Sequence, residues 1–373
     1  MKPVLFLKFP YASRFGGGER HTVLLCEELQ RRGGDFYFLG SCGVLHTEFA
    51  RRLWGHRRWW AGKEPVALWS AAVFPLTAPL AFIGLLAALL WYRIARHVGT
   101  VYCLSLTEKL LVTPFARLLG MRVLWAEHVE VGRWLASNPW RFLFVWWSRL
   151  AVVIAISKVI QEQLVAIGVP ERRINVVYNG VDLGPYPDVT RKMFHWTKRF
   201  LIGTVARLES EKGVAHLLQA FRELLVVIPH ARLMIVGDGS ERHKLEWLSR
   251  QLGIDAAVQW LGFQRNIPAW MKSFDCFVLP SVGRESFGVV LLEAMAAACP
   301  VVASNLGGIP EVVENNRTGI LVEPGDAELL MQALLFLYQH PDVAMRLGLR
   351  GRERVEERFS LATRLDELAR FFS

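Results

Sequence analysis

The first half of the chain alternates between short apolar runs and stretches with a helical pattern. An apolar run at residues 4–9 precedes a glycine-rich loop and a helical pattern over 21–34 that ends in glycines, which predicts a strand, a loop and a helix. Further apolar runs, each predicted to be a buried strand, lie at residues 35–40, 99–106, 121–128 and 150–157. Apolar strands separated by helices are typical of a parallel sheet that is covered on both faces.

The second half repeats this scheme. Strands are predicted at residues 200–208, 231–239, 257–263, 275–281 and 300–305. Helical patterns lie between them at residues 213–229, 241–253 and 266–274. We therefore expect an α/β protein with two Rossmann-like doubly wound domains that face a central cleft.

The length of 373 residues also favours two domains, since a single hydrophobic core usually stops growing at about 250–300 residues. We predict an N-terminal domain over residues 1–183 and a C-terminal domain over 200–355. Between them, residues 184–199 are rich in proline and charge and are the predicted linker. A C-terminal helix over 356–373 is expected to pack back toward the N-terminal domain.

Residues 65–92 carry no charge, and a run of this length suggests a membrane-spanning helix. A single crossing would, however, separate the first strand and its glycine loop from the domain that they should join. Pro75 and Pro79 also divide the run, and the longer piece, residues 80–92, is too short to cross a bilayer of about 30 Å. We expect a monotopic or shallow re-entrant insertion, with two buried core helices as the alternative.

The excess of basic charge lies in the first half of the chain. Residues 1–182 hold 22 Lys and Arg against 12 Asp and Glu, while residues 183–373 hold 22 of each. Basic clusters rich in tryptophan at 51–60 and 133–150 favour an anionic membrane surface, which we expect residues 51–92 and 133–150 to contact. No known nucleic-acid-binding module is recognisable, so no nucleic-acid partner is expected.

The five cysteines are scattered and odd in number, and no two of them form a Cys-x-x-Cys pair. This pattern argues against disulfides and structural zinc and fits a reducing compartment. Lys8 interrupts the first apolar run, which is unlike a signal peptide. We therefore expect a cytoplasmic protein that is associated peripherally with the inner face of the membrane.

Basic residues and glycines follow predicted strands of the second half, where doubly wound sheets bind their ligands. Arg207 and Lys212 precede a helix and could together bind a diphosphate; a pair of exposed surface ions is the alternative. Gly237 and Gly239 allow a tight turn, but Arg242 stands where a dinucleotide fingerprint has its third glycine. This argues against binding of nicotinamide or flavin.

Two carboxylates interrupt the apolar stretch RESFGVVLLEAMAAACPVVA. A helix that starts near Ser286 or Phe287 would place Glu285 at its N-terminus and leave N–H groups free for phosphate, near Gly288. Glu293 would project within about a quarter turn of Glu285, so the two could accept hydrogen bonds from a sugar and a ribose. The alternative is that Glu293 is an ordinary buried acid bonded to the backbone.

Several short motifs occur in a fixed order across nearly the whole chain. They read GGGER, AEH, AISK, VVYNGVD, ARLESEKG, VGDG and RESFGVVLLEAMAAACPVVAS with GGIPEVV. As a group they resemble the retaining glycosyltransferases of family 4. The resemblance implies the GT-B architecture of twin Rossmann-like domains, retention of anomeric configuration and independence of metal ions. The chain also lacks an Asp-x-Asp sequence, so we expect neither metal nor cofactor.

The resemblance implies specific roles for residues that match the motifs. Arg207 and Lys212 would hold the diphosphate of a nucleotide sugar, Glu285 would bind the donor sugar and Glu293 the ribose. His128 would lie near the reacting carbon and the acceptor. The implied catalytic residues are Glu285, His128, Arg207 and Lys212. The implied donor-binding residues are Gly16, Gly17, Arg207, Lys212, Gly237, Glu285, Ser286, Phe287, Gly288 and Glu293.

The expected function is transfer of a sugar from a nucleotide-sugar donor to a lipid-linked, glycolipid or polysaccharide acceptor at the membrane. UDP-sugars are favoured over GDP-mannose. One alternative is a catalytically silent, membrane-associated scaffold of the same fold, although the matching donor residues are all present. The other is a nucleotide-dependent oxidoreductase with twin α/β domains, although neither half has a Gly-x-Gly-x-x-Gly sequence after a strand.

Overall fold

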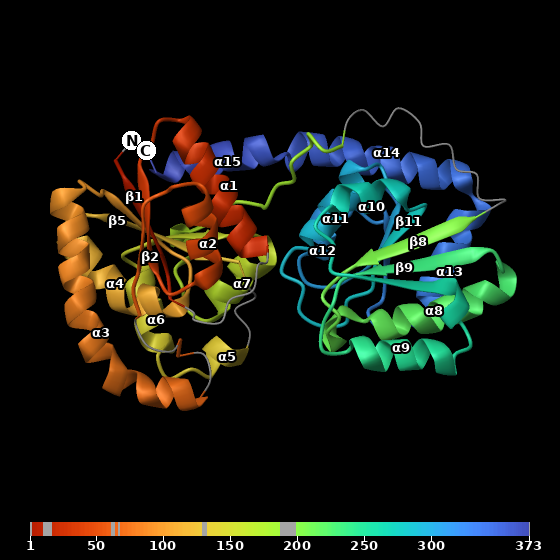
Figure 1. The fold of residues 1–373 in the computed structure, drawn as a ribbon, viewed down its shortest axis with the longest axis horizontal. Helices are drawn as coiled ribbons and strands as arrows, with labels where there is room; N and C mark the ends of the chain where they lie inside the picture. Colours follow the sequence, from red (N-terminus) through yellow and green to blue (C-terminus); the bar gives the residue numbers. More distant parts are fainter. Residues whose placement is uncertain are drawn as a thin grey trace. The chain divides into compact units, whose positions relative to one another are not determined.

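The protein divides into two compact units. They are seen in a computed structural model, which describes residues 2–9, 17–60, 64–65, 68–128, 133–186 and 199–372. One unit comprises Met1–Tyr178 with Arg364–Ser373, and the other comprises Asn179–Thr363. Each is a sheet covered by helices (Figure 1). The chain leaves the first unit at Tyr178, before the predicted domain end at residue 183.

The first unit is built on a parallel sheet in which the described residues form seven strands, in the order β3-β2-β1-β4-β5-β6-β7. The strands are β1 (Val4–Lys8), β2 (Phe36–Gly40), β3 (His56–Arg58), β4 (Thr100–Cys103), β5 (Arg122–Glu127), β6 (Val152–Ala155) and β7 (Ile174–Val176). Because β1 pairs with both β2 and β4, the winding of the chain reverses between β1 and β4. Ligands of such sheets bind at a reversal, beyond the carboxyl ends of the strands.

Helices follow the strands as the sequence pattern predicts. In the first unit these are α1 (Gly17–Arg31), α2 (Gly43–Arg51), α3 (Leu68–Ala95), α4 (Leu106–Leu118), α5 (Arg133–Ala136), α6 (Arg141–Ser148) and α7 (Lys158–Ala166). Local signals fix their ends. The Ser157 hydroxyl, for example, accepts a hydrogen bond from the Ile160 amide and caps α7.

Helix α3 corrects the interpretation of the long apolar run. The predicted division at Pro75 and Pro79 is wrong, because one helix of 28 residues runs through both positions. Packing on both sides of the prolines holds it. Before them, the Phe74 ring lies 5.4 Å from the Trp140 ring between centroids. After them, the Phe82 ring meets the Phe115 ring of α4, 4.5 Å away between centroids. The alternative of two buried core helices is also wrong, since part of α3 is exposed. Within the described part of the chain, no helix combines the length and apolar character that a membrane crossing needs.

The second unit is built on a second parallel sheet, whose described strands follow the order β10-β9-β8-β11-β12-β13. They are β8 (Phe200–Val205), β9 (Ala231–Val236), β10 (Val258–Gly262), β11 (Cys276–Leu279), β12 (Val301–Ser304) and β13 (Ile320–Val322). Its helices are α8 (Val214–Val227), α9 (Arg242–Gln251), α10 (Ile267–Ser273), α11 (Val289–Ala296), α12 (Ile309–Val312), α13 (Ala327–Gln339) and α14 (Pro341–Arg358). The winding reverses between β8 and β11. The α/β prediction of two Rossmann-like units is therefore confirmed.

The C-terminal segment is not one helix over residues 356–373. Helix α14 ends at Arg358 and α15 (Leu361–Ala369) begins after a break. The chain returns to the first unit at Arg364, and the Phe372 ring packs on Phe6 and Tyr102, 6.4 and 5.5 Å away between ring centroids. Both chain ends therefore lie at the first unit (Figure 1).

Candidate functional site

Lys212 and Glu285 form an ion pair at the reversal of the second sheet. Lys212 ends a 3-10 turn after β8, and Glu285 lies in the loop between β11 and α11. The Lys212 Nζ is 2.8 Å from the Glu285 Oε2, and the Ser281 hydroxyl donates to the same oxygen over 3.2 Å. The two charged side chains expose only 12% and 14% of their surface. Sequence reasoning missed Ser281, although its position directly beyond β11 was a usable signal.

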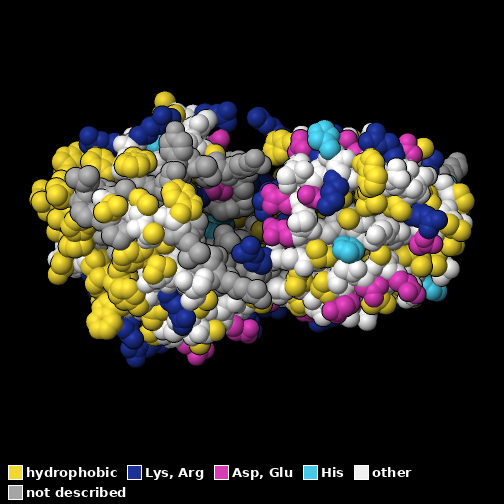
Figure 2. Space-filling model, turned by 90° about the horizontal axis from the view of Figure 1, so that it is seen from below, with side chains coloured by type: hydrophobic (Ala, Val, Ile, Leu, Met, Phe, Trp, Pro, Cys, Tyr) yellow, Lys and Arg dark blue, Asp and Glu magenta, His cyan; other side chains and the backbone are white. Residues whose placement is uncertain are grey.

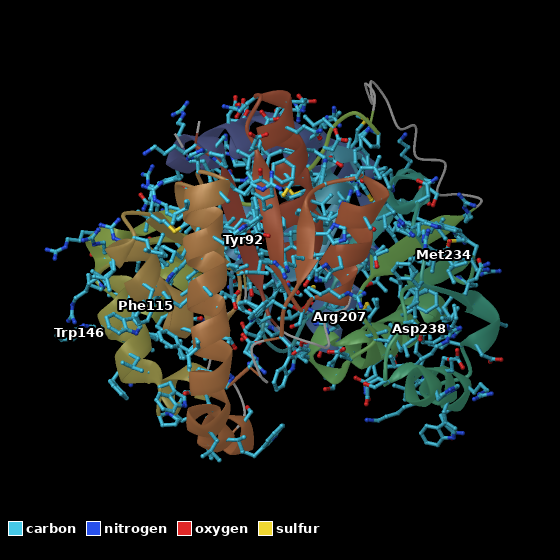
Figure 3. The ribbon with its side chains drawn as sticks, turned by 60° about the vertical axis from the view of Figure 1, so that its left-hand side comes forward. Tyr92, Phe115, Trp146, Arg207, Met234 and Asp238 are labelled. Atoms are coloured by element: carbon cyan, nitrogen blue, oxygen red, sulfur yellow. The ribbon has the colours of Figure 1, made fainter. Side chains whose placement is uncertain are left out.

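Arg207 has a more open environment. Its side chain is 60% exposed, with Nη1 2.8 Å from the Glu209 Oε1 and Nη2 3.6 Å from the Glu211 Oε1. Figure 3 labels Arg207 beside Asp238, each just beyond the end of its strand, β8 or β9. The alternative of exposed surface ions therefore describes Arg207 but not the inward-facing Lys212. Exposed ion pairs contribute only about 0–1 kcal/mol, so a bound anion could replace these carboxylates readily.

Gly237 lies in the tight turn after β9. Its φ is +133°, and a Cβ at this position would lie 1.8 Å from the Ala206 carbonyl oxygen. The close approach joins the loops that follow β8 and β9, where the Leu208 amide donates to the Asp238 carbonyl over 3.0 Å. Only glycine fits here, so Gly237 shapes the edge of the site through its backbone.

The helix of the acidic stretch begins later than predicted. Gly288 is its N-cap with a φ of +80°, a left-handed conformation that an α-helix cannot continue through, so α11 starts at the next residue. Ser286 and Phe287 therefore belong to the loop. Glu285 is not in a helical turn, so the predicted quarter-turn relation to Glu293 is wrong.

Glu293 is placed by α11 itself. Its surface is only 7% exposed, as the alternative of a buried acid requires. The loop that carries Glu285 is fixed separately, because the Glu285 carbonyl accepts a hydrogen bond from the Gly308 amide over 2.9 Å. The Lys212, Ser281 and Glu285 side chains are thus brought together by the segments that follow β8 and β11, while Glu293 is buried on α11.

His128 follows β5 at the carboxyl end of the first sheet and packs against α1. A Cβ on Gly18 would lie 3.7 Å from the His128 Cγ, and the His128 and His21 rings are 5.4 Å apart. Burial lowers the pKa of His21 to about 4 and that of His128 well below its usual value, so both imidazoles are neutral near pH 7. Gly17 begins α1, whereas Gly16 lies outside the described residues.

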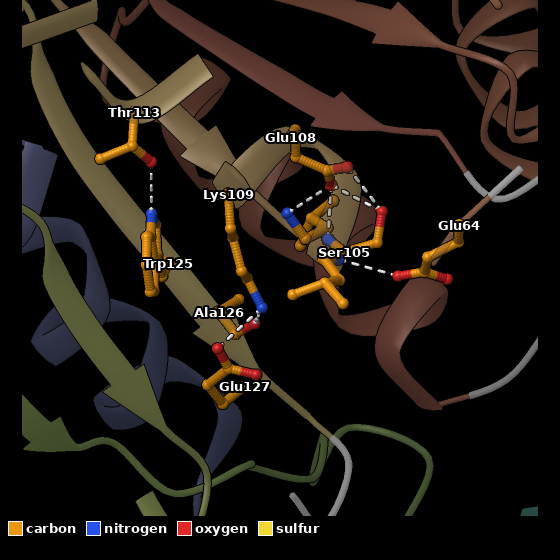
Figure 4. A network of polar contacts seen from close by, with 10 residues as sticks. Glu64, Ser105, Glu108, Lys109, Thr113, Trp125, Ala126 and Glu127 are labelled. Carbon is orange, nitrogen blue, oxygen red and sulfur yellow. Dashed lines mark hydrogen bonds and ion pairs between the residues drawn. The ribbon is translucent and has the colours of Figure 1, made fainter. Parts of the chain in front are cut away.

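Two buried ion pairs lie at the same end of this sheet. Lys8 of β1 pairs with Glu19 of α1. The Lys109 Nζ of α4 is 2.8 Å from the Glu127 Oε1 and donates to the Ala126 carbonyl over 2.9 Å (Figure 4). Burial raises the pKa of Glu127, and Lys109 opposes that rise. Sequence reasoning missed Lys8, Glu19 and Lys109 as members of ion pairs. Only Lys8 had a signal in the sequence, a charge within an apolar strand, because Glu19 and Lys109 lie on helices α1 and α4.

The outer side of the first unit carries exposed apolar residues. Four side chains of α3, spaced by seven residues and therefore on one side of the helix, are 44–75% exposed; we call them the α3 stripe. They are Trp69, Leu76, Ile83 and Leu90. Figure 2 shows how densely hydrophobic side chains gather over this unit. Trp146 of α6 lies at its margin in Figure 3, 60% exposed, with the Arg149 guanidinium 5.2 Å from its ring centroid.

The described residues include no group of three or more His, Cys, Asp or Glu side chains that could hold a metal ion. All five cysteines are buried, and none of them forms a disulfide.

Two family descriptions match successive parts of the chain. Glycosyltransferase Family 4 matches residues 15–184, and Glycosyl transferases group 1 matches residues 188–354. A GDP-mannose-dependent alpha-(1-6)-phosphatidylinositol monomannoside mannosyltransferase of Mycobacterium tuberculosis is 30% identical over 302 residues, which are 74% of this chain and 77% of that protein.

Other curated relatives match less of the chain. N-acetyl-alpha-D-glucosaminyl L-malate synthase of Bacillus anthracis is 33% identical over 215 residues, 56% of this chain and 55% of that protein. The chain spans about half the length of the first curated relatives that it matches.

Solved structures of similar fold cover nearly the whole chain. The Anabaena protein Alr3699/HepE, crystallised with UDP, superposes with a TM-score of 0.83 at 21% identity, over 100% of this chain and 99% of that chain. The lipopolysaccharide outer core galactosyltransferase WaaB superposes with a TM-score of 0.72 at 19% identity, over 99% of each chain. At these identities the likeness concerns the fold.

Proposed function

This chain belongs to the family 4 glycosyltransferases and has their GT-B fold, and we propose that it is a retaining, metal-independent hexosyltransferase. It would transfer a sugar from a nucleotide-sugar donor to a lipid-linked, glycolipid or polysaccharide acceptor at the membrane. The observation that carries the proposal is the buried pair of Lys212 and Glu285 at the reversal of the second sheet, which doubly wound folds use for ligands.

The donor would be held by charges that the free protein keeps paired. Lys212 would leave the Glu285 carboxylate for the diphosphate, and Arg207 would leave its exposed glutamates for the same group. The freed Glu285 carboxylate would then accept hydrogen bonds from donor-sugar hydroxyls. Glu293 would bind the ribose, and the backbone from Ser286 to Gly288 would approach the phosphates.

The chemistry proposed is a substitution on one face of the sugar. The bond between the anomeric carbon and the diphosphate oxygen breaks while the acceptor oxygen bonds to that carbon from the same side. The acceptor proton passes to the departing phosphate oxygen. The protein's part is to stabilise the charge that develops on the diphosphate, for which Arg207 and Lys212 are the groups at hand.

The donor nucleotide is proposed as UDP in preference to GDP. The Anabaena protein of similar fold was crystallised with UDP-glucose, whereas the mycobacterial relative is named for its dependence on GDP-mannose. Both nucleotides therefore belong in the experiment.

Membrane association is proposed to occur through the first unit, which would bring the enzyme to a lipid-linked acceptor from the cytoplasmic side. The α3 stripe offers apolar side chains, and arginines stand over tryptophans beside it. The Arg96 guanidinium lies 5.5 Å from the Trp91 ring centroid. The Arg149 guanidinium lies 5.2 Å from the Trp146 ring centroid. Exposed apolar surface rimmed by arginine and tryptophan suits the interface of an anionic membrane.

Donor binding is tested by thermal-shift titration of the purified protein with UDP, GDP, NAD and a short oligonucleotide. A ligand that binds only the folded state raises the unfolding temperature. We expect a shift with UDP, or with GDP, and none with the other two. A shift with NAD alone would favour the oxidoreductase, and no shift at all would favour the silent scaffold.

The role of Glu285 is tested by Glu285→Gln, with transfer from the nucleotide sugar followed by mass spectrometry. We expect turnover to fall about 100-fold while the unfolding temperature is kept, because the variant loses a charge that acts in the transition state. Glu246→Gln is the matched control. Glu246 also forms an ion pair, with its Oε1 2.8 Å from the Arg242 Nε, but it lies on α9, away from the proposed donor site. Near-normal turnover of Glu285→Gln would remove this residue from the site.

A further inference from the structure

Unsatisfied polar atoms gather at the carboxyl end of the first sheet, where its winding reverses. The Nδ1 of His21 and both ring nitrogens of His128 are buried and accept or donate no hydrogen bond among the described residues. The Thr107 hydroxyl, on α4 in the segment after β4, is also buried and makes no hydrogen bond among the described residues. Buried polar atoms without partners are rare, because each of them destabilises the fold. Several at one sheet end indicate a place built for a ligand.

The charges around these imidazoles are already neutralised. Lys8 is paired with Glu19, and Lys109 is paired with Glu127 and also bonded to the Ala126 carbonyl. The Lys109 and Glu127 side chains expose only 4% and 11% of their surface, so solvent does not compete for this pair. The His21 and His128 imidazoles are therefore uncharged groups that lie near two ion pairs whose charges are already neutralised.

A neutral imidazole offers one N–H donor and one acceptor nitrogen. A hydroxyl group also donates and accepts, so it matches a neutral imidazole, whereas a carboxylate or phosphate can only accept. The centroids of the His21 and His128 rings are 5.4 Å apart, and the ring planes are inclined to each other by 60°. Together they can hold more than one hydroxyl of a polyol.

We propose that His21 and His128 form a subsite for the hydroxyl groups of the acceptor, and that the ring bound there is an uncharged sugar. His21 is an acceptor-binding residue in this proposal, and the lysines hold the surrounding carboxylates rather than an acidic acceptor. The inference rests on the proposed glycosyltransferase function and specifies the class of its second substrate.

The experiment compares octyl hexosides with octyl hexuronides of the same ring configuration as acceptors, with UDP-hexoses and GDP-mannose as donors. Transfer and donor hydrolysis are both followed by mass spectrometry on the full chain. We expect transfer to octyl hexosides and at least tenfold weaker use of the matching hexuronides.

Variants of His21 are measured on the best acceptor. His21→Phe should raise the acceptor KM about tenfold, while donor hydrolysis, the UDP or GDP thermal shift and kcat stay near those of the parent protein. His21→Gln keeps a donor and an acceptor and should bring KM back to within about threefold. His46→Phe is the control, because His46 is a buried histidine of the same unit, also with an unpartnered Nδ1, that is bonded to the Gly40 carbonyl instead.

The outcomes separate this inference from the function on which it rests. A protein that neither binds nor hydrolyses any donor would refute the proposed function. Donor hydrolysis without transfer to any octyl hexoside, equal use of hexuronides, or an unchanged KM in His21→Phe would overturn the subsite alone. So would a loss of donor hydrolysis in parallel with thermal stability, which indicates a purely structural His21. If His21→Phe fails to fold, the comparison of acceptors on the parent protein decides.

Discussion

The replacement Glu108→Gln should make the first unit more stable at alkaline pH. Glu108 lies at the third position of α4 and is fully buried, and its Oε1 accepts hydrogen bonds from the Leu104 and Ser105 amides (Figure 4). The Ser105 hydroxyl also lies 2.7–2.8 Å from both carboxylate oxygens. Glutamine keeps an oxygen that can accept from the two amides, so the capping box should survive the change.

The magnitude follows from the pKa of Glu108. Burial raises it from 4.5 to about 7, and the nearby Glu64 adds to the rise, while the bonds from Ser105 and the backbone oppose it. The folded state therefore keeps the Glu108 proton up to about pH 7, whereas the unfolded state releases it near pH 4.5. This contribution to stability is fully present below pH 4.5 and is lost as pH rises through 7. The full contribution of Glu108 to the free energy of unfolding is about 3 kcal/mol, because the pKa differs by about 2.5 between the folded and unfolded states and each pKa unit corresponds to about 1.36 kcal/mol.

Urea unfolding followed by tryptophan fluorescence measures the effect. Ten of the 14 tryptophans lie in residues 1–182, so the signal reports mainly on the first unit. We expect the free energy of unfolding of Glu108→Gln, relative to the parent protein, to increase by up to about 3 kcal/mol between pH 5 and pH 8. Other groups, Glu127 among them, titrate in both proteins, so their contributions to the difference in unfolding free energy largely cancel. A difference between the two proteins that is the same at both pH values would refute the raised pKa.

Two further predictions concern the membrane and metal ions. The double variant Leu76→Gln with Ile83→Gln should bind anionic vesicles at least tenfold more weakly in co-sedimentation, because it removes two side chains that are 75% and 69% exposed from the α3 stripe. Val226→Gln, also 75% exposed but on α8 of the second unit, is the matched control, and unchanged sedimentation of the double variant would argue against the stripe as the contact. An excess of EDTA should leave the initial rate of transfer unchanged, and loss of activity that Mn²⁺ restores would contradict the metal-independent mechanism.

Strands with both faces buried could be predicted from their apolar residues, whereas β3, at the edge of the first sheet, could not. β1 is apolar up to Lys8, and β8 is apolar apart from Gly203 and Thr204, so both runs are visible in the sequence. β3 reads His56–Arg58, and all three side chains are exposed. Its position depends on backbone hydrogen bonds to β2, which leave no trace in the pattern of side chains. Polar residues at an edge strand are common for this reason.

The start of α11 was misjudged because the helical pattern of its apolar residues continues smoothly through Phe287. The boundary depends on the left-handed φ of Gly288 and on the hydrogen bond between the Gly308 amide and the Glu285 carbonyl. The first of these has a signal in the sequence, since glycine is the residue that adopts such a conformation without strain. The second joins residues that are far apart in the chain, so no local pattern could have predicted it.

The donor and acceptor residues differ in how far the sequence reveals them, and the reason is geometric. Lys212 and Glu285 each lie in the segment that joins a strand of the second sheet to the following helix, so counting strands locates them. In the first unit, by contrast, His21 meets His128 only because β1, β4 and β5 pair side by side and carry their following segments to one sheet end. Substitutions at that end can alter which acceptor is bound without changing any strand or helix pattern. Acceptor specificity within this fold should therefore vary more freely than donor chemistry, and it has to be established by contacts and assays.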